Sequence, residues 1–330
     1  MANIAFVSTA HIHTKPFIEQ ALKAADGRKI FGVWDDIPDR GKRYAELAKS
    51  RFFANLDELL ANKEVDGFVI CAENTQHLPL LKKLLPVEKP IFCEKPLVTS
   101  TADLKEVRNL LAKHPVPVFC GYMNPFSENM TGIASLLKSQ ALGKITRIRM
   151  VNAHHAAYGR WFDSPDLQWF TNPELSGGGA FMDMGTHAVH LVRTLFGPVK
   201  EVWADMGNHS ANYTAVDDWG MAQLRFVSGV VGSLTAAWTQ TGGIGGLEIL
   251  GEKAAIWNTA DGYVVGGPGL ETKPLKNGPK YPDRMDRLVA AIRKEIPEDG
   301  LKVDLEVTLD AVAIMEAAYC SAKSGKWEKV

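Results

Sequence analysis

The stretch Pro90-Ile91-Phe92-Cys93-Glu94-Lys95-Pro96-Leu97 places a carboxylate and an ammonium group directly after a short apolar run. An apolar run of this length, bounded by prolines, is typical of a buried strand. Ligands of open parallel sheets bind at the carboxyl ends of the strands, where a lysine can stabilise a developing oxyanion. The alternative is that Glu94 and Lys95 are solvated loop charges. The choice between these two interpretations of Glu94 and Lys95 depends on the rest of the sequence.

Strand-like and helix-like segments alternate from residue 3 to about residue 120. Apolar runs predict strands at residues 4–7, 30–34, 67–71, 91–93 and 116–120, and helical apolar spacing predicts helices at residues 17–25, 43–49, 56–60, 77–85 and 102–112. Apolar strands that alternate with helices indicate βαβ units and a parallel sheet covered on both faces. The predicted fold class is α/β, with a doubly wound Rossmann sheet in a dinucleotide-binding domain of residues 1–121.

The turn after the first predicted strand should carry the phosphates of a dinucleotide, but its glycine fingerprint is absent. A GxGxxG pattern allows a tight turn and close approach of the pyrophosphate, whereas this chain has Ser8-Thr9-Ala10-His11-Ile12-His13. Ser8 and Ala10 are still small enough for such an approach. Pro16 fits best in the first turn of a helix, which places the helix start near Thr14 as N-cap. The cofactor contacts expected in this turn are Ser8, Ala10, His11 and Ile12.

Acidic and polar residues follow the other predicted strands at the same edge of the sheet. Asp35 follows the second strand, at about the distance where an acidic residue hydrogen-bonds the adenosine ribose and repels a 2′-phosphate. Asp36 adds a second negative charge, so NAD is the predicted cofactor, with NADP as the alternative. Both aspartates could instead simply begin a turn before Pro38. The cofactor contacts expected after these strands are Asp35, Glu73, Asn74, His77, Glu94 and Lys95.

The pattern changes after Gly121 to strands that follow one another without helices. Such runs predict strands at residues 145–152, 199–206, 215–227, 230–238, 247–250 and 254–257, and helices are expected at residues 129–139 and 305–323. Strands without intervening helices indicate a mainly antiparallel sheet. We therefore predict an α+β domain over residues 122–330. Its last helix is apolar on most faces, so we expect it to be buried and to pack back on the first domain.

The overall composition and net charge argue against some classes of binding partner. The chain has 330 residues, enough for two domains, and a formal net charge of −1. A near-zero charge without basic runs argues against nucleic acid or an anionic membrane as partner, and no apolar segment reaches the roughly 18 residues that span a bilayer. Of the four cysteines, Cys71, Cys93 and Cys120 lie in or beside apolar runs, which favours buried free thiols. A cytoplasmic location fits these features best.

A glycine-rich segment in the second part carries acid–base candidates, and it reads Gly177-Gly178-Gly179-Ala180-Phe181-Met182-Asp183-Met184-Gly185-Thr186-His187-Ala188-Val189-His190. After the glycines it predicts a helix to Leu195. Asp183, His187 and His190 stand at i, i+4 and i+7, so they share one helix face. A lone helical histidine is more often a packing or surface residue. A carboxylate one turn earlier, however, can orient the ring and stabilise its protonated form.

Several motifs together resemble those of one enzyme family. They are Glu94-Lys95-Pro96, the Gly-Gly-Gly-x-x-x-Asp-x-Gly-x-His run ending at His187, Leu142-Gly143-Lys144-Ile145 and Ala317-Ala318-Tyr319-Cys320-Ser321-Ala322-Lys323-Ser324-Gly325-Lys326. Over nearly its whole length the chain resembles the Gfo/Idh/MocA family of glucose–fructose oxidoreductase and inositol dehydrogenase relatives. The resemblance implies a Rossmann domain, a second domain with a large open antiparallel sheet, and homodimers or homotetramers built through that sheet.

The resemblance also implies roles for individual residues. It makes Lys95, Asp183 and His187 the catalytic set, with Glu94 and Pro96 shaping the nicotinamide site and a Lys95–Pro96 peptide that is often cis in relatives. The loop from Ala72 to His77 matches the family's T-P-N-x-x-H segment, with Glu73 in place of proline. Asn124-Pro125-Phe126 stands where relatives often have an arginine-rich segment, and His190 stands where relatives are often acidic.

Two further interpretations concern the histidines and aromatic residues of the second part. Asp183, His187 and His190, with His154 or His155, could hold a metal, but the acid–base role explains two of them, so no metal is predicted. The rings of His154, His155, Tyr158, Trp161 and Trp169 are candidates for a sugar pocket, with plain packing as the alternative. The predicted substrate contacts are Lys95, Asn124, His155, Trp161, Asp183 and His187.

The predicted function is NAD(P)-dependent oxidation or reduction of a secondary alcohol on a sugar, sugar derivative or cyclitol. His187 would be the general base, Lys95 would hydrogen-bond the same oxygen, and Asp183 would set the imidazole tautomer. One alternative is an NAD-dependent glycosidase or lyase that oxidises its sugar transiently. The other is a non-catalytic, dinucleotide-responsive regulator.

Overall fold

The computed structural model describes residues 2–282 and 284–330 and divides the chain into two compact units. The first unit consists of Met1–Gly121, Asp163–Gly177 and Pro282–Leu309, and the second of Tyr122–Phe162, Gly178–Tyr281 and Asp310–Val330. The change of pattern after Gly121 coincides with the end of the first of these segments. The two later returns of the chain to the first unit have no comparable signal in the sequence.

The first unit is built on a six-stranded parallel sheet with the order β3-β2-β1-β4-β5-β6. Its strands are β1 (Asn3–Val7), β2 (Lys29–Trp34), β3 (Arg51–Phe53), β4 (Gly67–Ile70), β5 (Ile91–Cys93) and β6 (Val118–Cys120). The predicted doubly wound Rossmann sheet is confirmed. The strand order reverses between β1 and β4, which is the topological switch point where ligands bind in such sheets.

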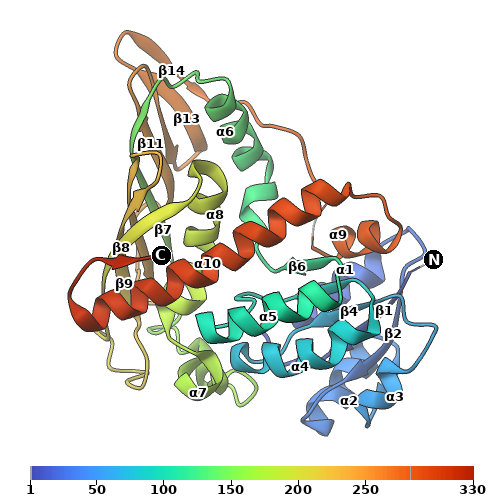
Figure 1. Ribbon diagram of the computed structural model, residues 1–330. Helices are drawn as coiled ribbons and strands as arrows, with labels where there is room; N and C mark the ends of the chain where they lie inside the picture. Colours follow the sequence, from blue (N-terminus) through green and yellow to red (C-terminus); the bar gives the residue numbers. More distant parts are fainter. Residues whose placement is uncertain (1, 283) are drawn as a thin grey trace. The chain divides into compact units, whose positions relative to one another are not determined.

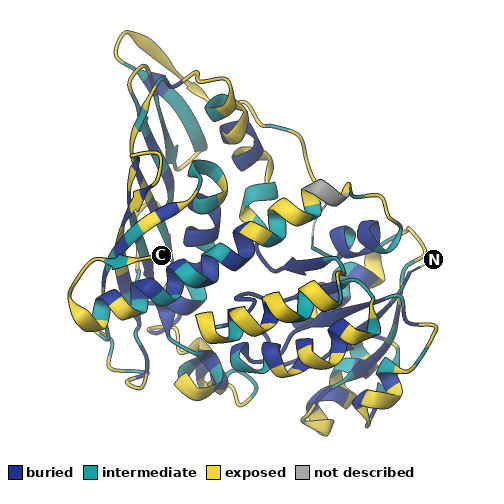
Figure 2. Ribbon diagram, viewed as in Figure 1, coloured by how far each residue is buried: buried dark blue, intermediate teal, exposed yellow. Residues whose placement is uncertain are grey.

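Helices cover both faces of this sheet, as its buried strands require. They are α1 (Thr14–Lys23), α2 (Pro38–Leu47), α3 (Leu56–Leu60), α4 (His77–Leu84), α5 (Thr101–Lys113) and α9 (Arg284–Ile292). α4 and α5 lie side by side (Figure 1), and α1 packs against α9 around Phe17, Met285 and Leu288. Strands β4, β5 and β6 are buried throughout and dark blue in Figure 2, whereas β3 and the ends of β2 are less buried. α9 was not predicted from the sequence.

The second unit is built on a nine-stranded sheet with the order β14-β13-β12-β11-β7-β10-β9-β8-β15. Its strands are β7 (Ile145–Ala153), β8 (Val199–Gly207), β9 (Trp219–Phe226), β10 (Val231–Ala237), β11 (Gly246–Gly251), β12 (Ala255–Thr259), β13 (Gly262–Gly267), β14 (Leu270–Pro274) and β15 (Glu328–Lys329). Neighbours are antiparallel except β7 and β10, which pair in parallel. The predicted mainly antiparallel sheet is therefore confirmed, with one parallel pair between strands far apart in the chain.

Helices cover one face of the nine-stranded sheet. Along β9 buried residues alternate with exposed ones, as expected for a sheet with one packed face. The buried residues pack against α6 (Glu128–Lys138), α8 (Thr186–Phe196) and the second-unit part of α10 (Glu298–Ser324). α8 and α6 lie along the sheet in Figure 1. This packing fixes α8, the helix that carries His187.

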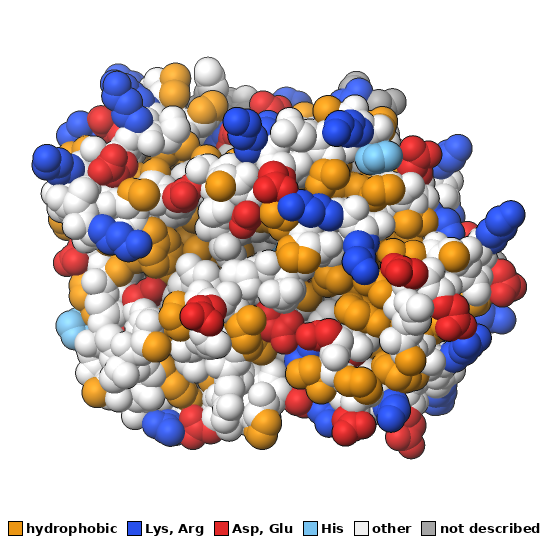
Figure 3. All heavy atoms as spheres, turned by 60° about the horizontal axis from the view of Figure 1, so that its bottom comes forward, with side chains coloured by type: hydrophobic (Ala, Val, Ile, Leu, Met, Phe, Trp, Pro, Cys, Tyr) orange, Lys and Arg blue, Asp and Glu red, His pale blue; other side chains and the backbone are white. Residues whose placement is uncertain are grey.

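The surface and the thiols agree with an ordinary globular chain. On the face shown in Figure 3, acidic and basic side chains are interspersed. In the part of the chain that the structure describes, no helix has both the length and the apolar character needed to cross a membrane. Cys71, Cys93 and Cys120 are buried free thiols, as predicted, and the Cys320 thiol is exposed.

Gly179 is the position where a side chain would be least tolerated in the second unit. A Cβ at this position would overlap the backbone carbonyl of Asp217, which cannot move aside as a flexible side chain could. We expect Gly179→Ala to lower the free energy of unfolding by about 3 kcal/mol or more. Gly242→Ala, where a Cβ meets nothing within 4 Å, should change it by less than about 0.5 kcal/mol. Urea unfolding of both variants measures the difference, and equal midpoints would contradict this account.

Candidate active site

The register of the parallel sheet brings the predicted cofactor residues to one edge. Val7 pairs with Trp34 on one side and with Ile70 on the other, and Ile70 pairs in turn with Cys93. The residues that follow these aligned strand ends are Ser8, Asp35, Cys71 and Glu94. Because all four strands run in the same direction, these residues leave the sheet at the same level, beside the switch point.

The β1–α1 loop is fixed to the strands on both sides by its own amides. Ser8 has φ +64°, a left-handed conformation that glycine usually takes. The Ser8 amide donates to the Trp34 carbonyl at 2.8 Å, and the His11 amide donates to the Cys71 carbonyl at 2.9 Å. The N-cap of α1 is His13, and the Thr14 hydroxyl donates to the His11 carbonyl. The expected N-cap at Thr14 was therefore wrong by one residue.

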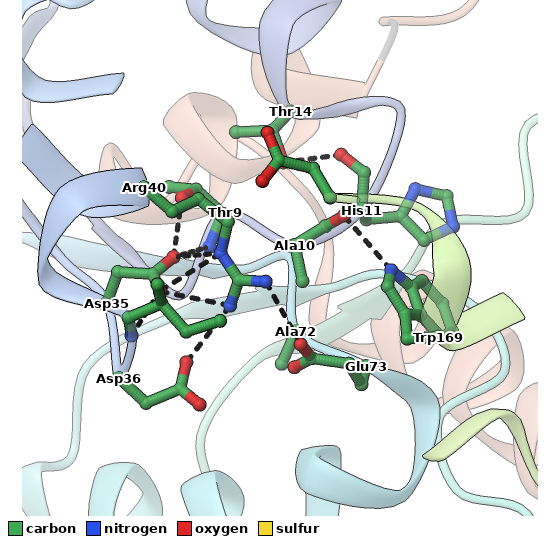
Figure 4. A network of polar contacts seen from close by, with 12 residues as sticks. Thr9, Ala10, His11, Thr14, Asp35, Asp36, Arg40, Ala72, Glu73 and Trp169 are labelled. Carbon is green, nitrogen blue, oxygen red and sulfur yellow. Dashed lines mark hydrogen bonds and ion pairs between the residues drawn. The ribbon is translucent and has the colours of Figure 1, made fainter. Parts of the chain in front are cut away.

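Asp35 is held by protein donors on both carboxylate oxygens. Its Oδ2 accepts from the amide and hydroxyl of Thr9 at 2.7 and 2.5 Å, and its Oδ1 accepts from the Ile37 amide at 2.8 Å. The Arg40 Nε donates to both oxygens at 3.0 Å. The side chain is fully buried. Asp35 was predicted to bind the adenosine ribose, whereas here its contacts anchor the β1–α1 loop and α2 (Figure 4).

Arg40 is the centre of an ion network that the sequence analysis did not identify. It joins Asp35 to Glu73, whose Oε1 lies 3.1 Å from Arg40 NH1, and to Asp36, whose Oδ1 lies 3.0 Å from NH2. Burial lowers the pKa of the guanidinium, but its contacts with Asp35 and Glu73 raise that pKa more. Burial and the repulsion by Glu73 and Asp35 raise the pKa of Asp36. The missed signal is Glu73 itself, because a buried glutamate in place of proline requires a cationic partner.

The segment Asp163–Gly177 returns to the first unit and covers the β1–α1 loop. Trp169 Nε1 donates to the Ala10 carbonyl at 3.1 Å, and its ring lies 5.9 Å from that of His11. Phe170 stacks on Trp169 and lies 5.4 Å from the His11 ring. Trp169 was placed with the sugar-pocket candidates in the sequence analysis. It instead packs on the predicted cofactor loop of its own unit, as Figure 4 shows.

The loops after β4 and β5 are joined through His77. Its ring nitrogens face the Pro96 carbonyl at 2.8 Å and the Ala72 carbonyl at 3.2 Å, and burial lowers its pKa. These backbone contacts give His77 a structural role, and its predicted cofactor contact stays a prediction. The Lys95–Pro96 peptide is cis. Asn74 Nδ2 donates to the Ser176 carbonyl at 2.8 Å.

Glu94 is a fully buried carboxylate next to Lys95. Its Oε2 accepts from the Lys95 amide at 2.9 Å, and its Oε1 lies 3.2 Å from His13 Nδ1. Burial by itself raises the pKa of Glu94, but the neighbouring imidazoles of His11 and His13 and the Arg284 guanidinium hold it well below its usual range. The carboxylate therefore remains ionised at neutral pH. The Lys95 side chain is likewise buried at this edge.

In the second unit, Asp183 lies in a π-helical turn that leads into α8. The turn covers Phe181–Gly185, and α8 starts at Thr186. Such turns occur frequently at functional sites. Asp183 Oδ2 accepts from Trp238 Nε1 at 2.9 Å. Asp183 and His187 are half-buried, while most of their neighbours in the turn and in the first part of α8 are buried. Both candidate acid–base groups therefore remain accessible to a small molecule.

His190 has a packing role. Its ring stacks on Tyr122 at 4.1 Å and an interplanar angle of 14°, and the His187 ring meets the same tyrosine edge-on at 5.8 Å. The Tyr122 hydroxyl lies 2.6 Å from the Thr186 hydroxyl. Among the described residues, Asp183, His187 and His190 are not found as a group able to hold a metal.

Asp217 and Tyr319 hold the start of this turn, and neither was assigned a role from the sequence. The Asp217 carboxylate accepts from the amides of Gly179 and Phe181 at 2.9 and 2.7 Å. The Tyr319 hydroxyl donates to Asp217 Oδ1 at 2.9 Å and accepts from the Met182 amide at 3.0 Å. A carboxylate at the N-terminus of a helix satisfies amides that have no partner within the helix. This arrangement fixes the position of Asp183.

The other three predicted substrate contacts, Asn124, His155 and Trp161, lie at two places in the second unit. Trp161 stacks on His154 at 4.8 Å and meets His155 edge-on at 5.3 Å, and both His155 and Trp161 are exposed. Asn124 lines a pocket of about 200 Å³ together with Asn152 and Tyr263. The pocket combines amide and phenol groups, which suits a small polar ligand.

The first unit thus has the features of a dinucleotide-binding Rossmann domain. Family models give the same result independently. Residues 2–122 match an oxidoreductase family with an NAD-binding Rossmann fold, and residues 131–257 match the GFO/IDH/MocA C-terminal domain. Both matches point to one family and together they cover most of the chain. The chain belongs to the GFO/IDH/MocA family of oxidoreductases.

Individual relatives are distant. Myo-inositol 2-dehydrogenase of Thermotoga maritima is 25% identical over 242 residues, which cover 72% of this chain and 69% of the relative. An inositol dehydrogenase homolog from Azotobacter vinelandii, complexed with NAD+, has a TM-score of 0.86 at 15% identity, covering 100% of this chain and 97% of that chain. The WlbA dehydrogenase of Bordetella pertussis, in complex with NADH and UDP-GlcNAcA, has a TM-score of 0.82 at 21% identity, covering 100% and 99%. These structures share the fold.

The polar atoms at the switch point fit a dinucleotide. Among the described residues, Ser8 Oγ and Asn74 Oδ1 are buried side-chain atoms without a hydrogen-bond partner. Buried polar groups are normally paired, so atoms of this kind at a ligand-binding edge indicate a polar ligand. Ser8, Asn74 and Lys95 would hold NAD from this edge. Asp36, whose side chain is about half exposed, is a more accessible carboxylate for the ribose than Asp35.

Proposed function

We propose that the chain is an NAD-dependent dehydrogenase or reductase that interconverts a secondary alcohol and a ketone on a sugar, sugar derivative or cyclitol. The observation that carries the proposal is the accessible Asp183–His187 pair on an otherwise buried helical segment, in a chain whose Rossmann edge ends in Lys95. Relatives named as inositol dehydrogenases, and one solved with NADH and UDP-GlcNAcA, support the substrate class.

Each proposed role follows from the chemistry of the side chain. NAD, when bound, supplies the hydride acceptor or donor. His187 takes the hydroxyl proton on a ring nitrogen during oxidation and returns it during reduction. The Lys95 ammonium hydrogen-bonds the same oxygen and stabilises its negative charge. Asp183, held by the Trp238 indole, orients the imidazole and favours its protonated form.

A binding and turnover screen tests the proposal. NAD should raise the melting temperature more than NADP, because Asp36 and Glu73 disfavour a 2′-phosphate, and stabilisation grows with ligand concentration by mass action. Sugars, sugar acids and cyclitols are then screened for NADH formation with the preferred dinucleotide. Binding of neither dinucleotide, or no turnover across the panel, would contradict the proposal. Conversion of a glycoside without NADH accumulation would indicate the transient-oxidation alternative.

The assembly and the compartment stay predictions. We expect a homodimer or homotetramer, which sedimentation of the purified chain measures directly. The cytoplasmic location likewise rests on composition alone.

A further inference from the structure

His11, His13 and Glu94 bring three possible metal ligands together in the first unit. One ligand atom from each residue lies within 4.8 Å of the other two. Two of these residues stand in the loop that replaces the glycine fingerprint, and the third directly follows β5. We propose that this group binds a divalent transition-metal ion. These residues differ from the alternative metal ligands considered above, Asp183, His187 and His190.

The distances are close to those of a metal site. His13 Nδ1 lies 3.2 Å from Glu94 Oε1, and His11 Nε2 lies 3.9 Å from Glu94 Oε2. The two imidazole centroids are 4.6 Å apart. A tetrahedral ion with bonds of about 2.0 to 2.2 Å separates its ligand atoms by roughly 3.4 Å. The two printed separations of 3.2 and 3.9 Å lie close to this value.

The donor set matches borderline-soft metals. Two imidazole nitrogens and one carboxylate are the protein ligands of one kind of catalytic zinc site and of facial non-haem iron sites. Three ligands leave at least one coordination position open for water or another oxygen ligand. His11 and Glu94 are buried, whereas about a third of the His13 side chain is exposed. The group is therefore reached by solvent at His13.

Surrounding contacts hold the ligands in place, as outer contacts do in known metal sites. The Lys95 amide donates to Glu94 Oε2 at 2.9 Å, and Trp169 and Phe170 pack on the His11 ring. The His13 amide donates to His11 Nδ1 at 3.2 Å. If His11 binds the ion through Nε2, the ring proton moves to Nδ1 and this long hydrogen bond is lost. The loss of one such hydrogen bond is small compared with the coordination of a metal ion.

Without a metal, the two imidazoles and the buried carboxylate would contact one another directly. The two arrangements differ in a measurable way, because only a metal site binds a stoichiometric ion. The test uses metal binding alone and no turnover, so its result is independent of the proposed function.

The experiment uses the full chain without a histidine tag, stripped with EDTA. Calorimetric titration with ZnCl₂ should give one ion per chain, and CoCl₂ should produce the visible absorption of cobalt bound by nitrogen and oxygen. His13→Ala should weaken binding by more than about 100-fold, since even outer contacts change affinity about 10- to 100-fold. Glu94→Gln should do the same with a side chain of equal size. Because the His13 side chain is partly exposed, His13→Ala is the less risky of the two variants for folding.

The matched control is His114→Ala. His114 also faces a glutamate, with Nδ1 3.5 Å from Glu88 Oε1, but this pair is not part of a three-ligand group among the described residues. It should bind zinc as the unmodified chain does. Absence of stoichiometric binding of both Zn²⁺ and Co²⁺, or equal affinity of the unmodified chain and folded His13→Ala, overturns the proposal. Loss of binding in His114→Ala would place the site elsewhere and overturn it too.

Discussion

Replacing His187 with asparagine is expected to lower kcat by about 10²- to 10⁴-fold, the usual contribution of a positioned acid–base group. Asparagine keeps a polar side chain of moderate size at this half-buried position but cannot accept the substrate proton. KM should change much less than kcat, because the proton moves only during the chemical step. Steady-state kinetics on a substrate found in the screen measures both constants. His209→Asn, on an exposed histidine of the same unit, is the control.

Lys95→Met is expected to lower kcat by a similar factor, because the ammonium stabilises charge on the reacting oxygen. If Lys95 and His187 act on the same oxygen, the double variant should lose less than the product of the two single losses. Circular dichroism of each variant separates this effect from unfolding. Near-wild-type turnover in both single variants would show that the catalytic assignment is wrong.

The two sheets could be predicted from the sequence because its clearest patterns are the apolar runs of buried strands. The apolar runs Gly67–Ile70 and Ile91–Cys93 are buried along their whole length. Such strands are typical of a parallel sheet covered on both faces. The elements that were missed have weaker signals. β3 and β15 have three and two residues. β13 and β14 are joined by a glycine-rich turn, and β13 is mostly half-buried while β14 is exposed. Their pairing depends on neighbours that local patterns do not reveal.

Residues of the candidate site could be predicted only where the residue type and its motif suggest a chemical role. Lys95 and His187 are recognisable as candidates from their motifs, and their roles stay predictions. Contacts between residues far apart in the sequence could not be predicted, because they depend on strand order. Arg40 meets Glu73 only because β2 and β4 flank β1 in the sheet. The bond from Trp169 to Ala10 likewise depends on a return of the chain to the first unit.

Asp35 makes structural contacts that its motif does not indicate, and its predicted contact with the ribose stays a prediction. Its position after β2 is that of a ribose-binding acid. In this chain, however, the neighbouring Thr9 and Arg40 saturate its oxygens. Arg40 therefore provides the main contact of Asp35 with α2. It lies in the first turn of that helix and belongs to no recognised motif. Removing Arg40 is the most direct way to measure what the network contributes.

Arg40→Met should lower the free energy of unfolding by about 3 to 5 kcal/mol, because it leaves the buried carboxylates of Asp35 and Glu73 without their cation. For a chain of this size, the melting temperature should fall by roughly 10 °C. Arg43→Met is the matched control, since Arg43 lies on the same helix and forms an exposed ion pair with Asp166. An exposed pair contributes at most about 1 kcal/mol. Adding Glu73→Gln to Arg40→Met should recover part of the loss, because one of the two unpaired charges is then removed. Calorimetry of the variants measures these differences, and equal melting temperatures for Arg40→Met and Arg43→Met would show that the buried network does not stabilise the fold.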